Sequence, residues 1–171
     1  MDRRYFLKQV GLWYAGLMTA APVFRITSRA LAAPAGKPEI TVGKGEDIAA
    51  QVRAVIDSMG GMSRFVKKGE RVVIKPNIGW DRNPAQAANT HPLVVKTLAE
   101  LALAAGAGSV AVFDRPCNEE RRCYHNSGIK PALTAVADDR LRCEYMDDRK
   151  FIPVDIQRGK ALQKWSFYKD A

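Results

Sequence analysis

Residues 71–77 read Arg-Val-Val-Ile-Lys-Pro-Asn, a continuous β-branched run between two cations that ends in Pro-Asn. Such a run is typical of a strand that is covered on both faces, as in a parallel sheet. Residues 76–91 show no hydrophobic periodicity, but from Pro92 apolar residues recur at helical spacing until a Gly-Ala-Gly at 106–108. A second apolar run at 110–113 predicts another buried strand. Strand, helix and strand together predict a right-handed βαβ unit with parallel strands.

The sequence on both sides of this unit predicts more strands and helices. A short strand is expected at 39–42, followed by a helix that begins after Glu46-Asp47 and ends at Gly60-Gly61. A helix at 129–137 and strands at 141–146 and 151–156 are predicted downstream. We therefore expect residues 39–171 to form an α/β fold: a Rossmann-like, mostly parallel sheet with flanking helices, incomplete in this chain.

The N-terminus has the pattern of an export signal. Residues 3–8 read Arg-Arg-Tyr-Phe-Leu-Lys, an apolar stretch covers 10–24, and Ala30-Leu31-Ala32 supplies a small-x-small cleavage site. The stretch is shorter than the about 20 residues of a membrane-spanning helix, so no permanent anchor is expected. Residues 3–8 resemble the twin-arginine motif, although Asp2 stands where Ser or Thr is usual. This predicts a signal peptide at 1–32, a linker at 33–38 and a periplasmic location, with the twin-arginine translocase and signal peptidase as partners; an amphipathic first helix is the alternative.

Charge and composition exclude some classes of function. The 171 residues carry a net charge of +9, but residues 1–32 hold five cations against one acid, which leaves +5 on the rest. The remaining cations are interspersed with acids, as in Glu-Glu-Arg-Arg at 119–122, and form no stripe with interleaved aromatics. We therefore expect no nucleic-acid partner.

The polar residues that follow the two central strands form the candidate site. In open α/β sheets, ligands bind beyond the carboxyl ends of the strands, and loops longer than about 12 residues are often functional. The loop 76–91 and the segment after the second strand both lie at that edge. The candidates are Lys75, Asn77, Thr90, His91, Asp114 and Cys117. The alternative is an ordinary polar rim in which Asp114 pairs with Lys75 or Arg115.

A family resemblance rests on several short motifs taken together. They are Gly-Gly-Met at 60–62, Val-Lys-Lys-Gly at 66–69, Lys-Pro-Asn at 75–77, Thr-His-Pro at 90–92 and a strand that ends at Asp114. Residues 40–117 resemble the domain of unknown function 362 family. That family has no settled general activity, and many of its members carry iron–sulfur segments. Its members are usually about twice this length, so the resemblance implies the N-terminal part of a longer protein.

The cysteines decide whether an iron–sulfur cofactor is expected within this chain. Cys117, Cys123 and Cys143 contain no C-x-x-C pair, and no ferredoxin-type motif is present. With His125 they form one candidate set of ligands for a cluster or for zinc. A buried free thiol at Cys143 and a disulfide between two of the three are the alternatives.

Two functions are compatible with these observations. The first is a periplasmic iron–sulfur or metal-dependent redox protein. In it, Lys75 and Asn77 bind an anionic or carbonyl group, while His91 and Asp114 carry protons or bind a metal, and Lys75, His91 and Asp114 are the catalytic candidates. Asn77, Thr90 and Cys117 are the candidates for cofactor binding. The second is a non-catalytic periplasmic binding protein that holds a small anionic ligand in the same cleft.

Overall fold

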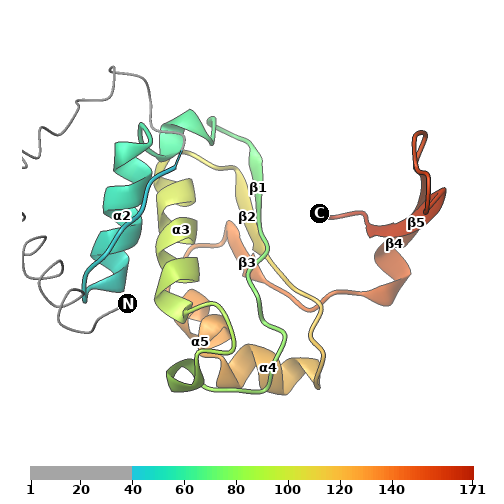
Figure 1. The fold of residues 1–171 in the computed structure, drawn as a ribbon. Helices are drawn as coiled ribbons and strands as arrows, with labels where there is room; N and C mark the ends of the chain where they lie inside the picture. The colour runs from blue at the N-terminus through green and yellow to red at the C-terminus, as the bar shows by residue number, and fades with distance from the viewer. Residues whose placement is uncertain (1–39) are drawn as a thin grey trace, which may run out of the picture. The chain divides into compact units, whose positions relative to one another are not determined.

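The computed structural model describes residues 40–171, so the predicted signal peptide at 1–32 and linker at 33–38 lie outside the described residues. Figure 1 shows the order of the elements along the chain. The α-helices are α2 Ile48–Ser58, α3 Pro92–Ala104, α4 Glu120–Asn126 and α5 Ile129–Thr134. The strands are β1 Arg71–Ile74, β2 Ser109–Val112, β3 Leu141–Cys143, β4 Phe151–Asp155 and β5 Lys164–Tyr168. Three short 3-10 turns cover Met62–Arg64, Pro84–Gln86 and Asp148–Lys150.

The three strands β1, β2 and β3 form a parallel sheet in that order. Val72 is in register with Val110, and Val110 is in register with Leu141. The predicted parallel pairing of the two central strands is therefore confirmed, and the sheet with its flanking helices is an α/β arrangement. The carboxyl ends of β1 and β2 meet at one edge, which we call the carboxyl edge.

The helices cover one face of this sheet. Figure 1 shows α2, α3 and α5 on the same side of the strands. Val110 and Val112 of β2 point into this helical layer, where they are fully buried, because alternate residues of a strand face the same side. The core they join consists of Val66, Ile78, Val95, Ala99, Ala102, Leu103, Ala107, Cys123, Tyr124, Ile129 and Leu133.

The other face of the sheet differs from the sequence-based expectation of strands covered on both sides. Phe113, which directly follows β2, is buried there by an edge-to-face contact with Tyr168, whose ring centroid lies 5.1 Å away. Along the rest of β2 a cavity of about 360 Å³ lies open against Arg71, Arg142 and Tyr168. In the described part of the chain, the C-terminal segment thus covers this face only in part.

The predicted helices and strands are mostly present, with different ends. The helix expected at 129–137 ends at Thr134, and the strand expected at 141–146 ends at Cys143. The strand expected at 39–42 was wrong over its described residues, since residues 40–42 have no regular structure. These residues lie beside α2, where the Ser58 hydroxyl bonds Thr41 Oγ1 at 3.2 Å, and no strand within residues 40–171 pairs with them.

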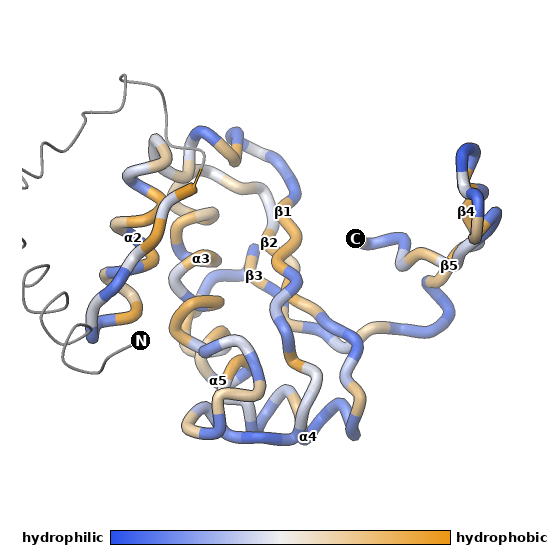
Figure 2. The backbone as a smooth tube through the Cα atoms, viewed as in Figure 1, coloured by the Kyte–Doolittle hydropathy of each residue, from blue (hydrophilic) through white to orange (hydrophobic). Residues whose placement is uncertain are grey.

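The C-terminal strands β4 and β5 form an antiparallel hairpin. Ile152 pairs with Phe167 and Val154 pairs with Trp165, so these four side chains share one face. All four are exposed, and Figure 2 shows the apolar residues of β4 and β5 among polar ones. We call Ile152, Val154, Trp165 and Phe167 together the apolar hairpin face. Among residues 40–171, no helix combines the length and the apolar composition that a membrane crossing requires.

Candidate functional site

Asp114 is the central residue of the carboxyl edge. It comes two residues after β2 ends and is only 5% exposed. One carboxylate oxygen, Oδ1, lies 2.6 Å from Lys75 Nζ, and the other, Oδ2, accepts a hydrogen bond of 2.7 Å from the Ile78 backbone N–H. Asp114 therefore joins the end of β2 to the residues that follow β1. The Lys75 side chain is 68% exposed, so its ammonium is held by the buried Asp114 and is still accessible to solvent.

Tyr124 fixes the backbone of the same aspartate, and sequence reasoning did not find it. Its hydroxyl donates to the Asp114 carbonyl and accepts from the Asp114 N–H, both at 2.8 Å. Burial raises the pKa of Tyr124, so the hydroxyl keeps its proton for this role. Tyr124 lies on α4, and the only local signal for α4 is Glu119, which caps the helix by accepting from two backbone N–H groups.

Asn77 and Thr90 close the long loop at its base. The Asn77 N–H donates to Thr90 Oγ1 and the Asn77 carbonyl accepts from the Thr90 N–H, each at 2.9 Å. The Asn77 side chain donates to the Ala88 carbonyl at 3.1 Å and accepts from the Gly79 N–H at 3.0 Å. The structure thus brings these two predicted site residues together. The polar side-chain atoms of Asn77 and Thr90 are hydrogen-bonded to the backbone of the loop.

His91 lies at the start of α3. Its Nδ1 accepts a hydrogen bond of 3.3 Å from the Leu93 N–H, which makes it the N-cap of the helix that Pro92 begins. Within residues 40–171, no hydrogen bond or ion pair joins His91 to Lys75 or Asp114. Of Lys75, Asn77, His91 and Asp114, only Lys75 and Asp114 are joined directly, by the ion pair that the alternative of an ordinary polar rim also predicted.

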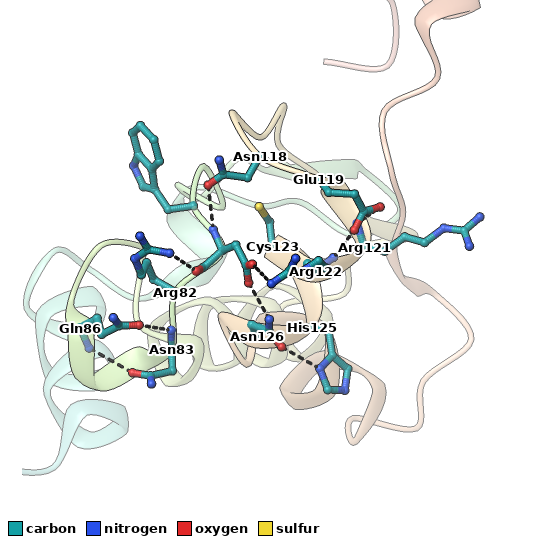
Figure 3. Close-up of polar contacts among 12 residues, drawn as sticks. Arg82, Asn83, Gln86, Asn118, Glu119, Arg121, Arg122, Cys123, His125 and Asn126 are labelled. Carbon is teal, nitrogen blue, oxygen red and sulfur yellow. Dashed lines mark hydrogen bonds and ion pairs between the residues drawn. The ribbon is translucent and has the colours of Figure 1, made fainter.

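The first half of the loop is fastened to α4 through Asp81. Its backbone N–H donates to Asn118 Oδ1 at 3.2 Å, and its carboxylate contacts Arg122 and the Asn126 amide, both at 2.6 Å. Figure 3 shows Asn118, Arg122 and Asn126 with their dashed contacts converging from α4 and the turn before it. These contacts give the long loop 76–91 a defined place against the helix.

Arg115 adds a cation to this edge and lies between two cavities. A cavity of about 580 Å³ is lined by Arg115, Asp148, Phe151, Trp165 and Ser166. A second one of about 220 Å³ shares Arg115 and Asp148. The guanidinium lies 2.9 Å from the Asp148 carboxylate and 5.0 Å from the centre of the Phe151 ring. Sequence reasoning placed Arg115 at this edge, and it could not foresee Phe151 and Trp165, which come from the distant hairpin.

The cysteines do not fit an iron–sulfur cluster within the described residues. Cys117 is exposed, Cys123 is buried and Cys143 is half-buried. Across residues 40–171, no three His, Cys, Asp or Glu side chains gather closely enough to hold one metal ion. Burial raises the pKa of Cys123, and it raises the pKa of Cys143 to about 11, which disfavours the thiolates that ligate metals. His125 instead contacts its neighbour Asn126 at 3.3 Å.

Together these features define an α/β protein with a lysine–aspartate pair and an arginine-lined cavity at its sheet edge. Residues 72–171 match the family described as Domain of unknown function (DUF362), and the chain belongs to this family. It is also similar to the thylakoid-associated protein sll1697 of Synechocystis sp. (strain ATCC 27184 / PCC 6803 / Kazusa), with 36% identity over 88 residues. That alignment covers 51% of this chain and 27% of the relative's length. No solved structure matches the chain.

Proposed function

We propose that this chain is the ligand-binding part of an exported DUF362 protein, and that its carboxyl edge binds a small organic anion through Lys75 and Arg115. The observation that carries the proposal is the Lys75–Asp114 pair, in which a buried carboxylate holds an exposed ammonium at 2.6 Å. An ammonium has three N–H donors, and Asp114 Oδ1 accepts from one. Two donors thus remain for a ligand.

Arg115 is suited to be the second cation. Its partner Asp148 and its own side chain are both largely exposed, so their ion pair contributes little stability and its loss costs little. A carboxylate or phosphate can therefore replace Asp148 and accept two parallel hydrogen bonds from the guanidinium. The aromatic side chains of Phe151 and Trp165 line the same cavity and suit the apolar body of an organic anion.

Isothermal titration with benzoate, and separately with inorganic phosphate, tests this proposal. We expect benzoate to bind, and the variants Lys75→Met and Arg115→Met each to weaken its binding about tenfold or more, because a hydrogen bond to a charged group is lost. Arg142→Met is the matched control, since Arg142 is exposed, faces Glu144 at 3.8 Å and lines the separate cavity along β2. Equal affinity in all three variants, or no binding of either probe, would contradict the proposal.

The same preparation distinguishes this function from a redox function. Many relatives that the sequence resembles carry iron–sulfur segments, so iron and acid-labile sulfide are measured on protein purified without oxygen. Stoichiometric iron and sulfide would replace the binding proposal with an iron–sulfur redox protein whose ligands include residues other than the three cysteines described above.

We further propose export to the periplasm by the twin-arginine translocase, followed by cleavage after Ala32. The supporting residues are the Arg-Arg-Tyr-Phe-Leu-Lys at 3–8 and the Ala-Leu-Ala at 30–32. Replacing Arg3 and Arg4 together with lysine is expected to abolish the periplasmic pool, measured by cell fractionation and immunoblotting. Lysine at Arg25 and Arg29 keeps the same charge and is expected to leave export intact. Undiminished periplasmic protein in the first double variant would refute this route.

A further inference from the structure

Two of the three cysteines meet at one backbone carbonyl. The oxygen of Gly79, in the long loop, accepts a hydrogen bond of 2.8 Å from the Cys117 N–H, and the Cys123 sulfur lies 3.9 Å from the same oxygen. The backbone N–H of Asn118, the residue directly after Cys117, acts to lower the pKa of the Cys123 thiol against the larger effect of burial. The sulfur of Cys123 therefore lies against the turn that carries Cys117.

We propose that Cys117 and Cys123 are a redox-active pair that closes to a disulfide and fastens the segment after β2 to α4. A disulfide requires its two Cα atoms within about 7 Å, and the contacts that Cys117 and Cys123 share at the Gly79 carbonyl place the two residues on adjoining segments, the turn before α4 and α4 itself. The Cys117 side chain is exposed and therefore free to turn toward its partner.

Exposure decides the order of the chemical steps. The Cys117 thiolate attacks one sulfur of oxidised glutathione, which breaks the glutathione S–S bond and releases one glutathione thiolate. The Cys123 thiolate then attacks the Cys117 sulfur, forms the Cys117–Cys123 bond and releases the second glutathione thiolate. The two released thiolates take up the two protons that the cysteines lose, so oxidised glutathione gains the two electrons. Burial raises the pKa of Cys123, which makes the second step the slower one.

Cys143 does not compete for either partner. It is the last residue of β3, in register with Val112, and it packs at the edge of the core, where it lines a cavity together with Leu133 and Asp138. Neither Gly79 nor Asn118 lines that cavity. The disulfide between two of the three cysteines that the sequence left open is therefore assigned to Cys117 and Cys123.

Tryptic mapping of the full chain tests the pairing, because the three cysteines lie in three different tryptic peptides. Trypsin cuts after Arg121 and Arg122 but not before a proline, so Cys117 lies in peptide 97–121, Cys123 in 123–140 and Cys143 in 143–149. The native protein is equilibrated in glutathione buffers of rising potential, quenched, alkylated and digested. We expect peptide 97–121 to become joined to 123–140, with the loss of two hydrogen atoms per chain and a rate independent of protein concentration.

Two variants with exposed or partly exposed sites complete the test. Cys143→Ser is expected to leave the cross-link unchanged, and Cys117→Ser is expected to abolish it while the fold, followed by circular dichroism, stays intact. A cross-link to 143–149 would overturn the proposal. So would a Cys117–glutathione adduct that never resolves, or full alkylation of both thiols at every potential.

Discussion

Replacing Asp114 with alanine is expected to lower the free energy of unfolding by about 3 kcal/mol, because the Ile78 N–H is left buried without an acceptor and Lys75 loses its partner. The Ile78 contact lies in the described core, where Ile78 is fully buried and Asp114 is 5% exposed, whereas Lys75 reaches Asp114 from the surface. Urea denaturation followed by circular dichroism measures the change as a shift in the midpoint.

Lys75→Met separates the two contacts of this aspartate. The lysine is largely exposed, so its removal is expected to cost less than about 1 kcal/mol while weakening the binding of benzoate. Asp114→Asn keeps an acceptor for the Ile78 N–H and should fall between the two. If Lys75→Met costs as much stability as Asp114→Ala, the ion pair and not the Ile78 hydrogen bond holds this edge together.

The Tyr124→Phe variant is expected to lose about 2 kcal/mol, since one deleted hydroxyl leaves two buried backbone groups of Asp114 without partners. The ring stays in place, packed edge-to-face on Tyr145 with the ring centroids 4.9 Å apart. Thermal and urea unfolding measure the loss.

Tyr145→Phe is the matched control for this variant. It removes a hydroxyl from the other member of the same aromatic pair, which is only partly buried, and is expected to change stability by less than about 0.5 kcal/mol. Equal losses in both variants would mean that the bonds to Asp114 do not explain the effect of Tyr124→Phe.

The βαβ unit was predictable because its signals are local. The β-branched run before Lys75, Pro92 at the start of a helix and the apolar run at 110–113 each specify one element without reference to the rest of the chain. The rule that parallel strands end at one edge then placed Lys75 beside Asp114, as observed.

The remaining parts of the site depend on contacts between distant segments. Helix α4 contains only Cys123 and Tyr124 as apolar residues, too few to show a helical period. His91 was expected to act in the site, but a residue that precedes a helical proline is also placed to cap the helix, and capping is its contact in the structure. Trp165 lies at the cavity because β5 pairs with β4, and no local sequence signal indicates that pairing.

The apolar hairpin face also bears on crystal growth. Sulfate and similar salts strengthen contacts between apolar surfaces, so crystals grown from them should form their first lattice contacts through Ile152, Val154, Trp165 and Phe167. Ordered packing through this two-stranded surface competes with edge-to-edge pairing of the same strands, which leads to aggregation. Lysine at position 165 would therefore favour a different lattice and leave the Lys75–Asp114 pair untouched.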